Sequence, residues 1–166
     1  MNITKYNQEN LRTIQALIET MSDEQFKEPL DILSGASIGA HVRHILEFYI
    51  CLLRANSTDT LCYDDRERNQ RIENDRSLAL VTVNNIRLTL EEIKSDRNMK
   101  LKSDFSASGG DVLLLDTSLF RELAYCFEHS VHHEALIKVG TKHLLNDSVL
   151  IENFGLAPST VRHRNG

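Results

Sequence analysis

The histidines of this chain are grouped in a way that suggests a reactive or ligand-binding site. The chain holds seven histidines, and five of them fall on two segments with helical patterning. His41 and His44 lie on the first segment, and His129, His132 and His133 lie on the second. Because neutral imidazole is a common ligand of divalent metal ions, this grouping indicates a metal site.

His129 and His133 stand four residues apart. In an α-helix this spacing puts the two side chains about 40° apart around the axis and one turn apart along it, so both can bind one ion. His133 falls inside the apolar stripe of its helix, His129 lies on the border of that stripe, and His132 projects to the far side. A pair of hydrogen-bonded core histidines is the alternative interpretation.

A third ligand has to come from a neighbouring helix. His41 lies well inside the apolar stripe of its segment, whereas His44 lies at the edge of that stripe, where a helix faces its neighbour. Spacing alone leaves both histidines open as the ligand. The chain has no HExxH motif and lacks the paired Glu-x-x-His pattern of di-iron bundles, so we expect a single ion with open coordination positions.

Four long helices are needed to position these side chains. Apolar residues recur every three or four positions in four segments. The expected helices cover residues 6–21, 37–55, 76–95 and 118–140. Two short runs within residues 99–116 flank a Ser/Gly-rich turn and predict a small β-hairpin between the third and fourth helices. The predicted fold class is all-α, a four-helix bundle with a hairpin excursion, in one domain over residues 1–166.

The composition is that of an ordinary globular protein. The chain has 166 residues, of which 41% are hydrophobic and 26% charged. A net charge of −5 and only two short basic clusters argue against nucleic acid as a partner. No apolar run approaches the roughly 18–20 residues of a membrane span, and the N-terminal residues lack a secretory pattern, so we expect no membrane partner and a cytoplasmic location. Three cysteines without CxxC spacing argue against a disulfide framework or a thiolate zinc site.

The two histidine segments resemble the metal-binding motifs of the DinB/YfiT-like metalloprotein superfamily. Residues 37–46, S-I-G-A-H-V-R-H-I-L, are similar to the second-helix motif of that family. Residues 128–135, E-H-S-V-H-H-E-A, are similar to its fourth-helix motif, in which a histidine and two variable residues precede paired histidines. The helix order and the excursion before the last helix also agree, so the resemblance covers residues 7–140.

The resemblance implies a set of ligands. The family's second-helix ligand is directly followed by two aliphatic residues, and His44 matches that position. His129 and His133 match the fourth-helix ligands, and His132 matches the histidine that is not a ligand. The chain departs from the better-known members after the paired histidines, where it has Glu-Ala-Leu in place of Arg-Gly-Gln.

Three neutral imidazoles would leave the ion its full charge, with positions open to water or substrate. Such sites accept several metals, and we expect zinc or nickel. The resemblance implies a metal-dependent transferase that acts with a small, low-molecular-weight thiol, and it implies a homodimer. A metal-dependent hydrolase is one alternative. A non-catalytic binding or sensing module, closed by His41 as a fourth ligand, is the other.

Several side chains could support the metal or its ligand, since a ligating histidine usually donates its second N–H to an acceptor. The candidates around the site are His41, His132, Glu128, Tyr49 and Tyr63. Glu47 is the weakest acceptor, because the pattern puts it on the solvated face. Arg66 and Arg68 could bind an acidic substrate at the mouth of the site, and a solvated charged loop is the alternative.

Overall fold

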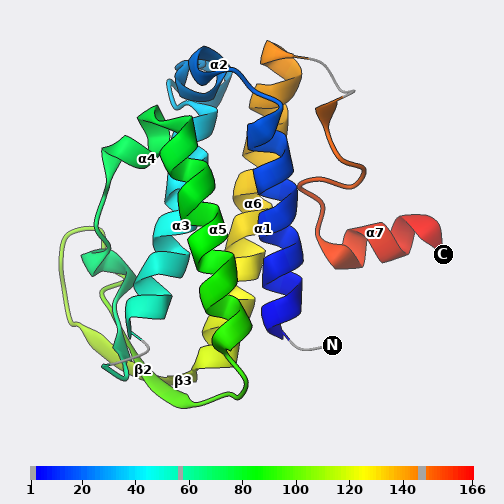
Figure 1. Ribbon diagram of the computed structural model, residues 1–166. Coiled ribbons are helices and arrows are strands. Elements are labelled where there is room, and N and C mark those ends of the chain that lie inside the picture. Colours follow the sequence, from blue (N-terminus) through cyan, green and yellow to red (C-terminus); the bar gives the residue numbers. More distant parts are fainter. Residues whose placement is uncertain (1–2, 56–57, 146–148) are drawn as a thin grey trace.

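Four long helices dominate the computed structural model, which describes residues 3–55, 58–145 and 149–166 (Figure 1). These helices are α1 (Ile3–Glu19), α3 (Ile38–Ala55), α5 (Arg76–Glu92) and α6 (Leu119–Leu144). Helix α1 packs against α5 and α6, and α3 packs against the same two helices. The four therefore lie side by side, and each has two neighbours among them.

Shorter elements surround these helices. They are α2 (Asp23–Lys27), the 3₁₀ turns η1 (Asp31–Leu33) and η2 (Tyr63–Asp65), α4 (Gln70–Asn74) and α7 (Pro158–Asn165). Helix α7 stands to the side of the four long helices, near the N-terminal end of α1 (Figure 1). In the described parts of the chain, no helix is both long and apolar enough to cross a membrane.

A small sheet caps one end of the molecule. Its strands are β1 (Thr60–Leu61), β2 (Asn98–Ser103) and β3 (Leu113–Ser118). Strand β2 pairs antiparallel with β3, with Leu101 opposite Leu115, and parallel with β1. The expected hairpin is present, but the all-α prediction is correct only in part, because the hairpin recruits a third strand. That strand is two residues long, too short to leave a periodic pattern in the sequence.

Short polar side chains start three of the long helices. Ser37 Oγ accepts the backbone N–H of Ala40 at 3.0 Å, and Asp75 Oδ1 accepts that of Leu78 at 2.9 Å. Ser118 Oγ accepts the N–H of Arg121 at 3.3 Å, which begins α6. Each side chain satisfies a backbone donor that has no partner inside the helix.

The predicted end of the last helix at residue 140 is wrong. Helix α6 continues to Leu144. A Cβ added at Gly140 would lie 2.9 Å from Leu33 Cδ1, so this glycine lets the loop before α3 pack closely against α6. A glycine that serves close packing in this way does not end a helix. The other long helices lie within a few residues of their predicted bounds.

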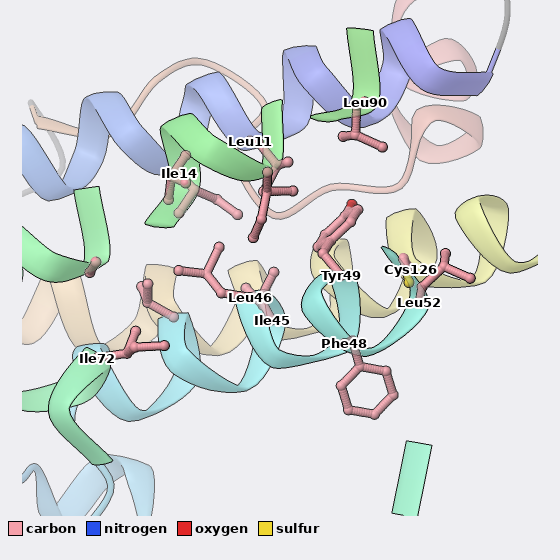
Figure 2. Packing of buried hydrophobic residues seen from close by; sticks show 14 of the residues in the cluster. Leu11, Ile14, Ile45, Leu46, Phe48, Tyr49, Leu52, Ile72, Leu90 and Cys126 are labelled. Atoms are coloured by element: carbon pink, nitrogen blue, oxygen red, sulfur yellow. The ribbon is translucent and has the colours of Figure 1, made fainter. Parts of the chain in front are cut away.

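The core lies between the four long helices. Figure 2 shows Leu11 and Ile14 of α1, Ile45 and Leu46 of α3, and Leu90 of α5 converging there. Each is at most 1% exposed. Full burial of such a side chain contributes roughly 1.5–3 kcal/mol. In the same view Tyr49 points into the core and Phe48 points away from it, on the other side of α3.

Candidate metal centre

His44 of α3 meets His129 and His133 of α6 where the two helices pack. One ring nitrogen of each lies within 4.8 Å of the others. The ring centroids of His44 and His133 are 4.5 Å apart, and those of His129 and His133 are 4.7 Å apart. All three side chains are partly buried. The structure thus brings together the three residues that the resemblance implied, and their binding of a metal stays a prediction.

His41 lies on the edge of this cluster. Its Nδ1 is 3.0 Å from Nδ1 of His133, so one of the two nitrogens carries a hydrogen and donates a hydrogen bond to the other. His132 is exposed, as expected, and its ring meets that of His133 edge to face at 5.4 Å. From spacing alone, either His41 or His44 could be the third histidine beside His129 and His133. The packing of α3 against α6 brings His44 within 4.8 Å of them.

Two ring nitrogens in the cluster are buried without a partner. Nε2 of His129 and Nε2 of His41 have no hydrogen bond within the described residues. Leaving such a group unpaired costs about 1–3 kcal/mol. A metal ion would give the His129 nitrogen a partner, so the residues present fit a bound ion.

Burial keeps the imidazoles neutral. It is the main cause that lowers the pKa of His133 to about 3, with the His44 ring as the next cause. It likewise lowers the pKa of His44 to about 4, helped by His129 and Arg66. The pKa of His129 is also lowered, mainly by burial. Neutral imidazole is the form that binds metal.

The expected carboxylate partners are not beside the cluster. Glu128 is exposed and lines a cavity of about 480 Å³ next to α7. Glu47, expected on the solvated face, is only 3% exposed, because the segment after β1 covers that side of α3. Its Oε1 accepts the backbone N–H of Asn69 at 2.8 Å. The prediction that Glu47 faces solvent is therefore wrong.

Tyr49 also lies away from the histidines. It is fully buried in the core, and its hydroxyl donates to Asn7 Oδ1 at 2.6 Å. Figure 2 shows its ring on the core side of α3. The expectation that Tyr49 supports the metal site is wrong, since this side chain ties α3 to α1 instead.

An aromatic wall borders the cluster. The Phe48 ring stacks on that of His129 at 4.2 Å and on that of Tyr63 at 4.8 Å. The Tyr125 ring also stacks on the His129 ring, with 5.7 Å between the ring centroids. Phe48 and Tyr125 were not predicted as site residues. Their spacing of four residues from His44 and His129 puts each on the same helix face as a histidine, and this signal could have found them.

Tyr63 contacts the Phe48 ring, which in turn stacks on His129. Its hydroxyl donates to Glu122 Oε2 at 3.0 Å, and burial raises its pKa far above the usual value for tyrosine. Glu122 is fully buried on α6 and also accepts Thr117 Oγ1 at 2.6 Å. Tyr63 therefore anchors the segment after β1 on α6.

The two loop arginines differ. Arg66 is partly buried, and its guanidinium carbon lies 5.2 Å from the Phe48 ring centroid. Its Nη1 donates a hydrogen bond to the backbone carbonyl of Tyr63 at 3.0 Å. Arg68 is exposed. Arg66 also lines a neighbouring cavity of about 260 Å³ with Cys51 and Cys62, where the Cys51 thiol donates to the Cys62 carbonyl at 3.1 Å. Only Arg66 is thus part of the surroundings of the histidines.

Comparison with curated proteins finds a relative of this chain. The chain is 39% identical over 106 residues to FK506-binding protein 5 of Rhizopus delemar. The match covers 62% of this chain and 27% of that protein, so the chain spans about a quarter of the relative's length. No family model and no solved structure matches the chain.

This relative overturns the family assignment made from the motifs. Its name points to a family other than the DinB/YfiT-like superfamily. The two motifs are short, and a histidine pair four residues apart reflects helix geometry that unrelated helical proteins share. The grouping of the histidines therefore rests on their observed positions alone.

Proposed function

We propose that this protein binds one divalent metal ion through His44, His129 and His133. The observation that carries the proposal is the position of three partly buried, neutral imidazoles, with one nitrogen of each within 4.8 Å of the others. The unpartnered Nε2 of His129 supports it. Zinc or nickel suits such an all-nitrogen set. We also propose that α1, α3, α5 and α6 constitute a four-helix bundle that carries this centre.

His41 has a supporting role in this proposal. Its contact with His133 uses Nδ1 of both rings, which leaves Nε2 of His133 for the ion. A second histidine that holds a ligating ring in one orientation raises metal affinity. His41 is not among the three residues whose ring nitrogens lie within 4.8 Å of one another, so an open site is favoured over one that His41 closes.

A bound ion would act as a Lewis acid that lowers the pKa of a bound water or thiol. Hydrolysis usually needs a general base near the ion, whereas thiolate binding needs none. Among the described residues, no carboxylate joins the three histidines in the close group of possible ligands. This favours a metal-dependent transferase acting with a small thiol over a hydrolase. The alternative to both enzymes is a non-catalytic module that only binds the metal.

Metal titration tests the proposal. Protein purified without an affinity tag is expected to bind one zinc ion per chain, and His133→Ala is expected to weaken binding about 100-fold or more. His143→Ala is the matched control, because His143 is an exposed histidine on the same helix. Less than about 0.1 metal per chain, with no affinity for added zinc or nickel, would rule the site out.

A thiol-conjugation assay separates the transferase from the binding module. Zinc-loaded native protein is expected to conjugate a small thiol to an electrophile, and the metal-free protein is expected to lose this activity. Turnover that is equal in both preparations would contradict a metal-dependent reaction.

Binding of FK506 is a second candidate. The relative's name says that it binds FK506, and 39% identity over 62% of this chain favours a test. The match covers 27% of the relative, so the name describes a protein much longer than the matched region. An increase in melting temperature on addition of FK506 would support binding, and an unchanged melting temperature at a saturating concentration would exclude it.

A homodimer and a cytoplasmic location also remain proposals. Strand β3 is at the edge of its sheet and exposes Leu113, Leu114 and Leu115, each by 41% or more. Such an apolar edge favours pairing with a second chain. Sedimentation of the native protein tests this, and Leu114→Lys is expected to shift any dimer towards monomer.

A further inference from the structure

A cavity of about 480 Å³ lies where α7, α6 and the start of α1 meet. Ile3 of α1 and Phe127 and Val131 of α6 give it apolar walls, and all three side chains are partly exposed. Phe127 and Val131 are four residues apart, so they share one face of α6. A concave apolar surface of this volume, with a few polar groups, is typical of a site for a small molecule.

Helix α7 has little packing of its own to hold it beside this cavity. It is eight residues long, and none of its described side chains is buried. Isolated helices shorter than about 12 residues are marginal in water, so a helix of this length depends on contacts with its surroundings. Figure 1 shows α7 to the side of the four long helices. A molecule in the cavity would give α7 and α6 a common partner.

Two charged side chains of opposite sign line the cavity. Glu128 belongs to α6 and Arg162 to α7, and both are exposed to solvent. Neither has an ion-pair partner among the described residues, although both line the same cavity. Ser159, one turn before Arg162 on α7, adds a hydroxyl to the lining. A ligand that carries one positive and one negative group could therefore pair with both charged side chains.

We propose that this cavity binds an apolar amino acid, whose carboxylate pairs with Arg162, whose ammonium group pairs with Glu128 and whose side chain lies against the apolar wall. A guanidinium presents donors that match the two oxygens of a carboxylate, and an ammonium group donates to a carboxylate such as that of Glu128. A ligand with a single charge would leave one of the two side chains unpaired, and a wholly polar ligand would gain nothing from the apolar wall. None of the three clustered histidines lines the cavity, so this inference goes beyond the metal site.

Isothermal titration calorimetry with phenylalanine tests the inference. It is done in EDTA, so that metal plays no part, and at pH 6, where the α-amino groups are protonated. N-acetylphenylalanine lacks the ammonium group, and phenylalanine amide lacks the carboxylate. The native protein is expected to bind each derivative at least about fivefold more weakly than phenylalanine, because each loses one ion pair.

Each charged side chain should account for one of these differences. Glu128→Gln is expected to bind phenylalanine and its N-acetyl derivative equally, and Arg162→Met is expected to bind phenylalanine and its amide equally. Glu92→Gln on α5 and Arg164→Met on α7 are the controls, since both residues are exposed and outside the cavity lining. Both controls should keep both differences. Substitutions at such exposed positions change stability little, so the variants are expected to fold.

Amide hydrogen exchange locates the bound ligand. Phenylalanine is expected to slow exchange in α7, because this helix gains a packing partner. The inference would be overturned by the absence of binding in millimolar phenylalanine, by equal binding of the three ligands, or by protection confined to other elements. Protection of α7 that rises with protein concentration in the absence of ligand would also overturn it, because a second chain would then cover the cavity.

Discussion

Helix α6 carries two polar clusters on opposite sides, and they differ in how their polar atoms are satisfied. His133 faces α3, and the next residue, Glu134, faces α1. Glu134 accepts a hydrogen bond from Asn10 Nδ2 and another from the backbone N–H of Gly155 at 3.4 Å. Ser130 Oγ donates to Asn10 Oδ1 at 2.7 Å. In the histidine cluster, by contrast, Nε2 of His129 has no partner among the described residues.

Burial acts on both clusters in the same sense, since it disfavours the charged form of each group. It raises the pKa of Glu134 to about 7 and lowers the pKa of His133 to about 3. The difference is therefore one of partners and not of environment. A satisfied network holds α1, α6 and the C-terminal segment together, whereas an unsatisfied one leaves a free energy that a ligand can recover. This difference is our reason for placing the function at the histidines.

The largest expected effect is on the free energy of unfolding, and it comes from the hydrogen-bonded cluster around Glu134. Asn10→Ala removes the amide between Glu134 and Ser130 and leaves a buried carboxyl short of a donor. We expect the free energy of unfolding to decrease by about 3 kcal/mol, as measured by urea denaturation in EDTA. Asn84→Ala, at an exposed position on α5, is the control and should change it by less than about 0.5 kcal/mol. A similar effect of both substitutions would show that the network does not hold the helices together.

The second effect belongs to the histidine side. Zinc at a hundredfold excess over its dissociation constant should stabilise the native protein by about 2.7 kcal/mol. The Asn10→Ala variant should keep this gain, and His129→Ala should lose it. Without metal, His129→Ala should cost less than about 1 kcal/mol, because its Nε2 has no hydrogen bond to lose. A larger cost in EDTA would mean that His129 is structural, and the contrast between the clusters would fail.

Substitution of His41 tests whether this residue is a metal ligand or only holds His133 in place. His41→Ala removes the partner of His133 Nδ1, and we expect zinc affinity to decrease about tenfold. The exposed His132 supplies the control, and His132→Ala should leave the affinity nearly unchanged. A decrease as large as that caused by His133→Ala would identify His41 as a ligand and the centre as closed.

The smallest expected effect concerns a single hydroxyl. Ser130→Ala leaves Asn10 Oδ1 without its donor, which should cost about 1 kcal/mol of stability. Ser77→Ala, at an exposed position on α5, is the control for the change of residue type. Zinc affinity should not change, although Ser130 directly follows His129. A change in affinity would show that the two sides of α6 are coupled.

Much of the architecture could be predicted from the chain alone. Apolar periodicity located the four long helices, and caps such as Ser37 and Asp75 lie where polar residues precede apolar patterns. The hairpin was also predicted, because its two runs flank a turn of small residues. Local patterns of this kind depend on neighbouring residues, so they can be recognised without a tertiary structure.

The surroundings of the histidines were harder to predict. Glu47 was expected in solvent and is buried, and Tyr49 was expected at the site and lies in the core. The short motifs also suggested a family that the comparison with known proteins contradicts. Each error arose from a pattern along one helix, which does not record what packs against that helix.

That His129 and His133 share a helix face follows from the amino-acid sequence, because the helical repeat places residues four apart on one side. The contact of His44 with this pair, the stacking of Phe48 on His129 and the contact of Glu134 with α1 become visible only when the helices are packed together. A sequence repeat fixes angles around one helix axis and no more. The rotation of α3 and α6 relative to each other comes from packing, which involves residues far apart in the chain.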